Sequence, residues 1–351
     1  MTRKATVQAW FLAPACSLWL TASVAQATGG TPAATPASLS SIPTAAPATA
    51  SPIPPLSADS LPEVTVERDE PQFVAPTRRD RIGRIWAPVM IDGKGPFRLV
   101  LDTGANHSAV IQRTADALNK PQSAETAHVT GVTGSATVPT LRVGSMEVGE
   151  LLLGPTFLPI LPDVFGGAQG VLGREGLANM RIVADFGNDR LTITRSRGQR
   201  TRGNYSAVPL QVVHDGLLMA NVLVGRVPTR AIIDTGAQRT IGNEALREAL
   251  QHHPYGRATT EDIVGVTLDV QQGDNQPSPP IALGNVRLEG VRITFGDMYL
   301  FEHWKMTAEP TLLIGMDMLG SFDLVVIDYR THELDLRQRP SMSNWKILPI
   351  S

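Results

Sequence analysis

Cysteine is almost missing from this sequence, and so is any concentration of charge. Cys16 is the single cysteine among 351 residues. The rest of the chain therefore offers no thiol nucleophile, no disulfide and no thiolate metal site. The formal net charge is −2 and no long basic run occurs, so the sequence does not indicate a nucleic-acid-binding surface. A chain of this length can bury a large core without disulfides.

Several patterns of familiar enzymes are missing as well. No Gly-x-Ser-x-Gly motif is present, which leaves a serine hydrolase unsupported. The glycine-rich stretch 166–170 lacks the Lys-Ser/Thr that a phosphate-binding loop needs. The histidines, among them His252, His253 and His303, do not follow a metal-ligand spacing such as His-Glu-x-x-His. We therefore expect neither a metal ion nor another cofactor.

The first 27 residues have the composition of a secretory signal peptide. Two basic residues precede a mostly apolar stretch, residues 9–22, and the small residues 25–27 offer a cleavage site. Cleavage after Ala27 would accompany export, and we expect the periplasm as the location. The apolar run is short for a membrane span. Anchoring through an uncleaved N-terminal segment, or through a lipid on Cys16, is the alternative.

Residues 28–60 consist almost entirely of alanine, proline, threonine and serine. Such a segment has too little bulky apolar surface to offset its ordering entropy, which predicts a disordered or extended linker. Residues 61–84 carry more charge. We interpret them as a lead-in strand or plain linker, with an inhibitory prosegment as the alternative.

One short pattern occurs twice, each time after three apolar residues. The two copies are Asp102, Thr103, Gly104, Ala105 and Asp234, Thr235, Gly236, Ala237. The apolar run indicates a buried strand, and Asp-Thr-Gly indicates a tight loop that leaves it. Before the first copy, segments 87–92 and 97–101 are predicted to be strands joined by a turn at 93–96. Each copy therefore places a carboxylate at the end of a rigid element. Two copies in the same context indicate an internal duplication.

The similarity continues beyond these loops. Segments 112–118 and 243–250 fall at matching positions and are predicted to be short helices. His107 is expected at the start of the first of them, and a place in the lining of the cleft is the alternative. Further on, two apolar residues precede Gly173 in the first copy and Gly315 in the second. The matched offsets drift by about ten residues, which a longer loop in the second copy would explain.

These matches divide the chain into two similar lobes. We predict a first lobe over residues 85–195 and a second over residues 207–340. An arginine-rich join at 196–206 connects them, and a C-terminal tail at 341–351 has a strand-like centre at 345–348.

Apolar-apolar-Asp-Thr-Gly-Ala followed by apolar-apolar-Gly resembles the aspartic proteases. The alanine after the glycine is more similar to the retropepsin branch than to the pepsin branch, as in exported bacterial retropepsin-like proteases with two lobes in one chain. The resemblance implies an all-β fold with short helices, in which two retropepsin-like lobes form a pseudo-dimer. It implies a catalytic pair, two bracing threonines and two glycines that pack behind the site: Asp102 and Asp234, Thr103 and Thr235, Gly173 and Gly315.

The resemblance also implies a hairpin that closes over a bound peptide. This candidate flap consists of Gly131, Val132, Thr133 and Gly134, and residues 264–267 are its counterpart in the second lobe. An ordinary surface hairpin is the alternative. In two-lobed proteases of this kind the termini and the join pair into a sheet beneath the active site, so we expect the tail there.

Two carboxylates that share one proton supply both the base and the acid that hydrolysis of a peptide bond by water requires. We therefore predict an aspartic endopeptidase that acts on polypeptides and works as a monomer. Neither Ala105 nor Ala237 can donate a hydroxyl to the pair, which favours a mildly rather than strongly acidic working pH. Two alternatives stay open: a protein of the same fold that only binds peptides, and lobes that pair between two chains.

Overall fold

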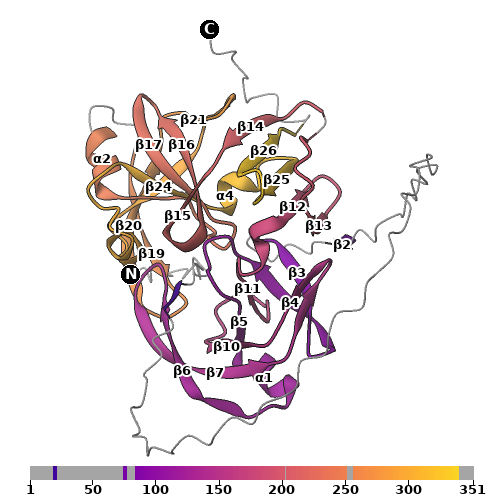
Figure 1. Ribbon diagram of the computed structural model, residues 1–351. Coiled ribbons are helices and arrows are strands. Elements are labelled where there is room, and N and C mark those ends of the chain that lie inside the picture. Colours follow the sequence, from indigo (N-terminus) through magenta and orange to yellow (C-terminus); the bar gives the residue numbers. More distant parts are fainter. Residues whose placement is uncertain (1–18, 22–73, 77–83, 202, 251–255, 340–351) are drawn as a thin grey trace, which may run out of the picture. The chain divides into compact units, whose positions relative to one another are not determined.

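The computed structural model describes residues 19–21, 74–76, 84–201, 203–250 and 256–339 (Figure 1). The predicted linker and the C-terminal tail with its strand-like centre lie outside these residues, as do most of the predicted signal peptide and of the lead-in segment. His252 and His253 also lie outside them.

The first lobe is built on one large mixed sheet. Its strand order is β1-β6-β7-β10-β5-β11-β4-β3-β8-β9. The strands are β1 (Trp19–Thr21), β6 (Gln122–Thr130), β7 (Ser135–Val143), β10 (Thr156–Leu161), β5 (Ala109–Ile111), β11 (Gly170–Leu172), β4 (Lys94–Leu101), β3 (Trp86–Ile91), β8 (Met146–Val148) and β9 (Leu151–Leu153).

The second lobe repeats this order strand for strand, from β19 in the place of β6 to β22 in the place of β9. Its strands are β19 (Thr259–Val264), β20 (Val270–Pro277), β23 (Arg292–Phe295), β18 (Ile241–Gly242), β24 (Thr311–Ile314), β17 (Val227–Ile233), β16 (Leu217–Val224), β21 (Ile281–Leu283) and β22 (Val286–Leu288), with β15 (Gln211–Val213) beside β16. The mainly β fold with two repeated lobes, predicted from the sequence, is confirmed.

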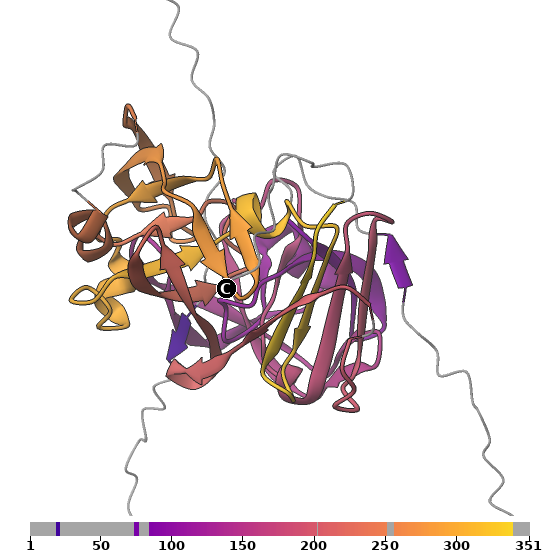
Figure 2. The ribbon, with the colours of Figure 1, turned by 90° about the horizontal axis from the view of Figure 1, so that it is seen from above.

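A third sheet joins the lobes. Its strands in order are β14 (Ser206–Pro209), β26 (Glu333–Arg337), β25 (Leu324–Asp328), β12 (Met180–Asp185), β13 (Arg190–Arg195) and β2 (Val74–Pro76). β12 from the first copy pairs antiparallel with β25 from the second, so an approximate two-fold axis passes between them. Figure 2 shows these yellow and pink strands side by side.

Short helices complete both lobes: α1 (Gln112–Leu118), α2 (Glu244–Leu250), α3 (Tyr299–His303), α4 (Met316–Leu319) and the 3-10 turns η1 (Leu177–Asn179) and η2 (His214–Gly216). The two predicted helices are present, and the Asn243 side chain accepts the Leu246 N–H at the start of α2, 2.9 Å away. α3 lies between β23 and β24, and no helix is found at the matching place between β10 and β11. This added segment accounts for most of the longer loop expected in the second copy.

The hairpin that leads into the first Asp-Thr-Gly loop turns earlier than predicted. A four-residue turn was expected at 93–96, but Ile91 pairs with Lys94 and the turn is the dipeptide Asp92-Gly93. Both turn residues have positive φ, 49° and 72°. Asp-Gly is a favoured sequence for this kind of two-residue turn. β4 therefore begins within the stretch that had been taken for a loop.

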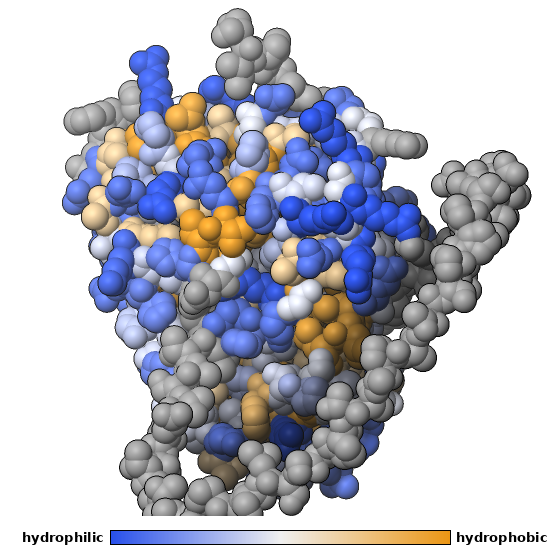
Figure 3. Space-filling view, in the orientation of Figure 1, coloured by the Kyte–Doolittle hydropathy of each residue, from blue (hydrophilic) through white to orange (hydrophobic). Residues whose placement is uncertain are grey.

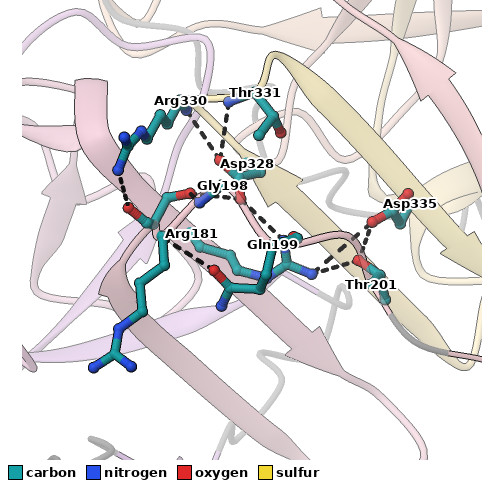
Figure 4. A network of polar contacts seen from close by, with 10 residues as sticks. Arg181, Gly198, Gln199, Thr201, Asp328, Arg330, Thr331 and Asp335 are labelled. Atoms are coloured by element: carbon teal, nitrogen blue, oxygen red, sulfur yellow. Dashed lines mark hydrogen bonds and ion pairs between the residues drawn. The ribbon is translucent and has the colours of Figure 1, made fainter. Parts of the chain in front are cut away.

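A buried ion pair joins the lobes across the third sheet (Figure 4). Arg181 on β12 lies 2.9 Å from Asp328 on β25, and both side chains are largely buried. Ser196 donates its hydroxyl to the same carboxylate, 2.8 Å away. Arg181 also donates to the carbonyl of Gln199 and to the hydroxyl of Thr201, both in the join. Arg181 thus contacts the first lobe, the second lobe and the join at once. Movement of any of these parts would leave a buried charge without its partner, which is costly.

The surface seen in Figure 3 is largely hydrophilic, with smaller apolar areas. The exposed large apolar side chains of the described residues are Leu152, Phe157, Val212, Leu223, Leu268 and Val270. A surface groove of about 560 Å³ opens beside Leu223 on the second lobe, and neither Asp-Thr-Gly loop lines it. None of the described helices is long and apolar enough to cross a membrane.

Candidate active site

Both Asp-Thr-Gly loops leave the ends of central, buried strands. Asp102 follows β4, and its N–H donates to the Leu172 carbonyl on β11 at 3.0 Å. Asp234 follows β17, and its N–H donates to the Ile314 carbonyl on β24, also at 3.0 Å. In each lobe these two strands run parallel to each other. Each aspartate therefore follows a strand that is hydrogen-bonded to a parallel neighbour, and its own N–H continues that pairing.

The two threonines tie the loops to each other. The Thr103 hydroxyl donates to the Ile233 carbonyl at 2.7 Å and accepts the Thr235 N–H at 3.1 Å. The Thr235 hydroxyl makes the mirror-image pair, to the Leu101 carbonyl at 2.7 Å and from the Thr103 N–H at 3.1 Å. Four buried hydrogen bonds thus hold the ends of β4 and β17 together about the two-fold axis.

Each carboxylate is oriented by its own loop. Asp102 Oδ1 accepts the N–H groups of Gly104 and Ala105, both at 2.9 Å. Asp234 Oδ1 accepts those of Gly236 and Ala237, at 2.8 and 3.2 Å. Two backbone N–H groups of its own loop therefore hold one oxygen of each carboxylate.

The carboxylates face each other closely enough to interact. A Cβ on Gly104 would lie 2.7 Å from Asp234 Oδ2, so only glycine leaves room for the opposite carboxylate. Both aspartate side chains are fully buried. Burial, and next the charge of Asp234, raise the pKa of Asp102 well above its usual value, against the lowering effect of the Ala105 and Gly104 N–H groups.

This electrostatic arrangement favours one shared proton. When both groups are ionised, Asp102 Oδ2 is buried without a donor among the described residues. A proton held between the two carboxyls supplies that hydrogen bond, and Asp102 is within bonding reach of Asp234. Two like charges this close do not ionise independently, so the pair must titrate as one coupled unit.

Gly173 and Gly315 pack directly behind the loops. A Cβ on Gly173 would lie 2.4 Å from the carbonyl carbon of His107. A Cβ on Gly315 would lie 2.6 Å from the carbonyl oxygen of Arg239, the matching residue of the second loop. A side chain at either position would therefore clash with the backbone of the loop.

Sequence reasoning missed a second pair of carboxylates that brace these loops. Ser108 donates its N–H to Glu175 at 2.5 Å, and Gly173 N–H donates to the Ser108 hydroxyl at 3.0 Å. In the second lobe Thr240 donates its N–H and hydroxyl to Asp317 at 3.0 and 2.8 Å. The signal was available, because Ser108 and Thr240 both follow the aspartate by six residues.

One contact breaks the two-fold symmetry. Arg174 donates to the carbonyl of Gly104 at 3.2 Å and to that of His214 in η2 at 3.3 Å, so it joins the first loop to the second lobe. The matching residue in the second lobe is Met316, which cannot donate.

His107 lies before β5, not at the start of α1 as expected. Burial, and then the nearby Arg174, lower the pKa of His107.

The candidate flap is a hairpin between β6 and β7, and its tip touches the matching tip between β19 and β20. The Thr133 hydroxyl donates to the Asp269 carbonyl at 2.7 Å. A Cβ on Gly131 would lie 2.9 Å from Val266 Cγ2. Leu300 of the second lobe donates its N–H to the Val132 carbonyl at 3.2 Å. This tip is therefore packed against the other lobe, unlike an ordinary surface hairpin.

The tips exchange apolar side chains between the lobes. Val132 is 1% exposed and belongs to a cluster of second-lobe residues that includes Ala237 and Phe301. Val266 is fully buried in the first-lobe cluster that includes Ala105. Because each cluster contains the alanine of an Asp-Thr-Gly-Ala loop, the two tips lie on the same side of the lobes as the carboxylates.

No three His, Cys, Asp or Glu side chains of the described residues gather in a way that could hold a metal ion.

A family model described as aspartyl protease matches the chain in two segments, residues 87–176 and 219–318. Together the segments cover more than half of the chain and contain one Asp-Thr-Gly loop each. No curated protein matches the sequence.

Proposed function

Because the chain belongs to the aspartyl protease family, we propose that it is an endopeptidase that activates water between Asp102 and Asp234. The observation that supports this proposal is the buried carboxyl pair, held face to face by four hydrogen bonds between the threonine loops. A protein that only bound peptides would gain nothing from bringing two desolvated carboxyls together, because their mutual repulsion is costly.

The proposed reaction uses the single proton of the pair. The ionised carboxyl takes a proton from water, and the water oxygen attacks the peptide carbonyl carbon while the protonated carboxyl gives its proton to the carbonyl oxygen. The C–N bond of the tetrahedral intermediate then breaks as one carboxyl gives its proton to the amide nitrogen and the other takes the proton of a hydroxyl, which yields the carboxylic acid and the amine and restores the single proton of the pair. The backbone N–H groups that orient each carboxyl reduce the reorganisation that these transfers require.

The hairpin tips would shield this chemistry from solvent. In the structure they meet each other and bury Val132 and Val266. A peptide can reach the carboxyls once the tips separate, and their return excludes bulk water from the site.

Replacement of either aspartate tests the proposal. We expect Asp102→Asn and Asp234→Asn each to lower kcat for cleavage of an unfolded protein by roughly 10²–10⁴-fold, because an amide cannot share the proton. Glu248→Gln, a similar change at an exposed position on α2, serves as the control and should leave cleavage unchanged. Unaltered cleavage in both aspartate variants would show that another group activates the nucleophile. Peptide binding without any cleavage by the wild-type chain would instead indicate a binding protein.

We also propose that the chain is exported to the periplasm and acts there on polypeptides as a monomer. The composition of residues 1–27 supports export, and the bonded pair of loops within one chain supports a monomer. N-terminal sequencing of the protein from a periplasmic extract should begin at Thr28. Activity that elutes with the mass of one chain on a sizing column would support the monomer, and activity found only in a dimer fraction would contradict it.

A further inference from the structure

Burial and mutual repulsion act on both aspartates, so they do not decide which of the two keeps the shared proton. Asp102 and Asp234 are both fully buried, and each accepts two N–H groups of its own loop. In a perfectly symmetric pair the proton would be divided equally. A preference for one aspartate therefore requires a difference between the two loops.

The side chain of Arg174 supplies such a difference. Its Nη1 donates to the carbonyl oxygen of Gly104 at 3.2 Å. That carbonyl belongs to the same peptide group as the N–H of Ala105, which donates to Asp102 Oδ1 at 2.9 Å. Hydrogen bonds in such a chain strengthen one another, because the cation draws electron density toward the carbonyl oxygen and makes the N–H a better donor. One peptide group thus links the guanidinium to the carboxylate of Asp102.

The second lobe has the same peptide group without the cation. Met316 stands in the place of Arg174, and its thioether has no proton to donate. The backbone is otherwise equivalent, because the N–H groups of Arg174 and Met316 donate to the carbonyls of Ala105 and Ala237, at 3.0 and 2.8 Å. The N–H of Ala237 lies 3.2 Å from Asp234 Oδ1, compared with 2.9 Å for the matching bond of the first lobe. The longer bond is found in the lobe that lacks the guanidinium.

The guanidinium is held in place by the second lobe. Arg174 is only 6% exposed, and its Nη2 donates to the carbonyl of His214 in η2 at 3.3 Å. Gly216 of the same turn packs against it, since a Cβ there would lie 2.9 Å from Arg174 Nε. An arginine side chain stays charged at every pH at which the protein is folded. The first loop therefore has a fixed positive charge behind it.

Three titratable side chains near Arg174 do not cancel this charge at mildly acidic pH. Burial raises the pKa of Glu175 to about 7, so its carboxyl is neutral below that pH. Burial raises the pKa of Tyr329 above its usual range, so its hydroxyl keeps its proton. Burial, and then Arg174, lower the pKa of His107, which disfavours a second cation at this place.

The charged groups of the second loop do not compensate either. Arg239 stands in the place of His107, but its side chain is exposed, so solvent screens its charge. Asp317 stands in the place of Glu175 and contacts the second loop through Thr240. Any negative charge on Asp317 disfavours an ionised neighbour in that loop, which acts in the same direction as Arg174.

We propose that Arg174 is a positioning residue that places the shared proton on Asp234 and leaves Asp102 as the base. The inference rests on the proposed protease function. In that reaction Asp102 takes a proton from the attacking water, and Asp234 gives its proton to the carbonyl oxygen of the peptide. When the C–N bond breaks, Asp102 gives its proton to the amide nitrogen and Asp234 takes one from a hydroxyl. Each cycle thus ends with the proton on Asp234 again.

The expected preference is modest but measurable. Strengthening of one charge-assisted hydrogen bond should favour Asp102 as the ionised member by at least about threefold. Asp102 is then ionised in at least about three quarters of the molecules that hold one proton on the pair. Without the guanidinium the two aspartates should be ionised about equally, and the lower apparent pKa of the pair should rise by at least about 0.3 unit.

Carbon-13 NMR of the aspartate carboxyls tests the placement without substrate. The unaltered chain is labelled at aspartate Cγ, and the two resonances are identified by their absence in Asp102→Asn and Asp234→Asn. At a pH between the two apparent pKa values of the pair, we expect Asp102 nearer its ionised limit and Asp234 nearer its protonated limit. Equal displacement of the two resonances, or the reverse order, would overturn the proposal.

The substitution Arg174→Met tests the cause. Methionine is the residue that the second lobe has at this place, so it is compatible with such a loop. We expect Asp102 and Asp234 to become ionised to the same extent, and the amide proton of Ala105 to shift upfield, with the amide proton of Ala237 as the reference. The control Arg113→Met removes an exposed arginine on α1 and should leave these resonances unchanged.

If Asp102 remains the more ionised member in Arg174→Met, another group places the proton and the proposal is wrong. The measurement on the unaltered chain decides where the proton lies even if this variant does not fold.

The pH dependence of kcat/KM for cleavage of an unfolded protein separates proton placement from a structural role. We expect Arg174→Met to move the acidic limb of the profile upward by at least about 0.3 unit, so that the loss below the limb exceeds the loss on the plateau by about twofold. Arg113→Met should keep the original profile. An equal loss at every pH would show that Arg174 only supports the fold.

The two measurements also separate this inference from the proposed function. Preferential ionisation of Asp102 that depends on Arg174, with no cleavage by any chain, would refute the protease and leave the proton placement standing. Cleavage that requires both aspartates, with equal ionisation of the two in the unaltered chain, would refute the placement and leave the protease standing.

Discussion

Glu175 leads to a quantitative prediction about the stability of this fold. The residue is partly exposed, but its carboxylate oxygen Oε2 is buried and has no hydrogen-bond partner among the described residues. Burial raises the pKa of Glu175 from 4.5 to about 7, although Ser108 donates hydrogen bonds that lower it. The buried carboxyl atoms, not the exposed remainder of the residue, determine this pKa. The folded state therefore holds the proton more tightly than the unfolded state, and the free energy of unfolding must fall as the pH rises from about 4.5 to about 7.

The substitution Glu175→Gln removes this pH dependence while it keeps an oxygen for the Ser108 N–H. The difference between 4.5 and about 7 corresponds to about 3 kcal/mol lost by the wild-type chain above pH 8. Most of that loss develops between pH 5 and pH 8. We therefore expect the free energy of unfolding of the variant, minus that of the parent chain, to rise by about 2.5 kcal/mol over this interval.

Urea unfolding at pH 5, 6, 7 and 8 measures this difference, with the fluorescence of the buried Trp86 and Trp304 as the signal. Both chains carry Asp234→Asn, so that unfolded molecules are not cleaved during the titration. Glu248→Gln in the same background makes the same chemical change at an exposed position, and its difference should stay constant with pH. Parallel curves for Glu175→Gln and its parent would refute the reasoning that the folded protein holds a desolvated carboxyl here.

Two further substitutions test the contacts between the lobes. Thr103→Val removes a hydroxyl with two buried hydrogen bonds to the other loop, and should lower the free energy of unfolding by about 2–4 kcal/mol in urea titrations, whereas Thr103→Ser should cost less than about 1.5 kcal/mol. Asp328→Ala removes the nearer carboxylate from the largely buried Arg181 and leaves it only Asp335, 4.0 Å away, so it should cost about 3 kcal/mol at pH 7. Burial works to raise the pKa of Asp328, but hydrogen bonds from Ser196, the loop N–H groups and Arg181 outweigh it and lower the pKa below 3.8. The cost of Asp328→Ala should therefore persist above pH 4 and shrink as the pH falls through the folded pKa, and a cost independent of pH would contradict this account.

The duplicated loops made most of the fold predictable. Apolar strands before Asp102 and Asp234, with helices at equal distances after them, are local patterns that burial and periodicity explain. The resemblance to the aspartic proteases implied the bracing role of the two threonines. The turn before β4 was misplaced because the prediction relied on the glycines and the proline at 93–96, whereas the positive φ values fall at Asp92 and Gly93.

Other features have no signature in a single sequence. Val132 and Val266 are each buried in the other lobe because two hairpins that are far apart in sequence come into contact in the fold. Glu175 and Ser108 stand at positions that the second lobe repeats as Asp317 and Thr240, but only the structure shows that the Glu175 carboxylate accepts the Ser108 N–H. The pairing of Trp19–Thr21 with β6 was not expected, because the composition of that segment indicates a signal peptide, and a signal peptide is not normally part of the fold.

Arg174 and Met316 occupy equivalent places behind two nearly identical loops, and so do Glu175 and Asp317. In an enzyme assembled from two copies of one short polypeptide, any exchange behind one loop appears behind the other as well. When the two copies are joined in one chain, a substitution in one copy no longer appears in the other. Each half of this chain can change on its own, so one aspartate can become the better proton acceptor and the other the better donor, a division of labour that a symmetric homodimer acquires only when substrate binds.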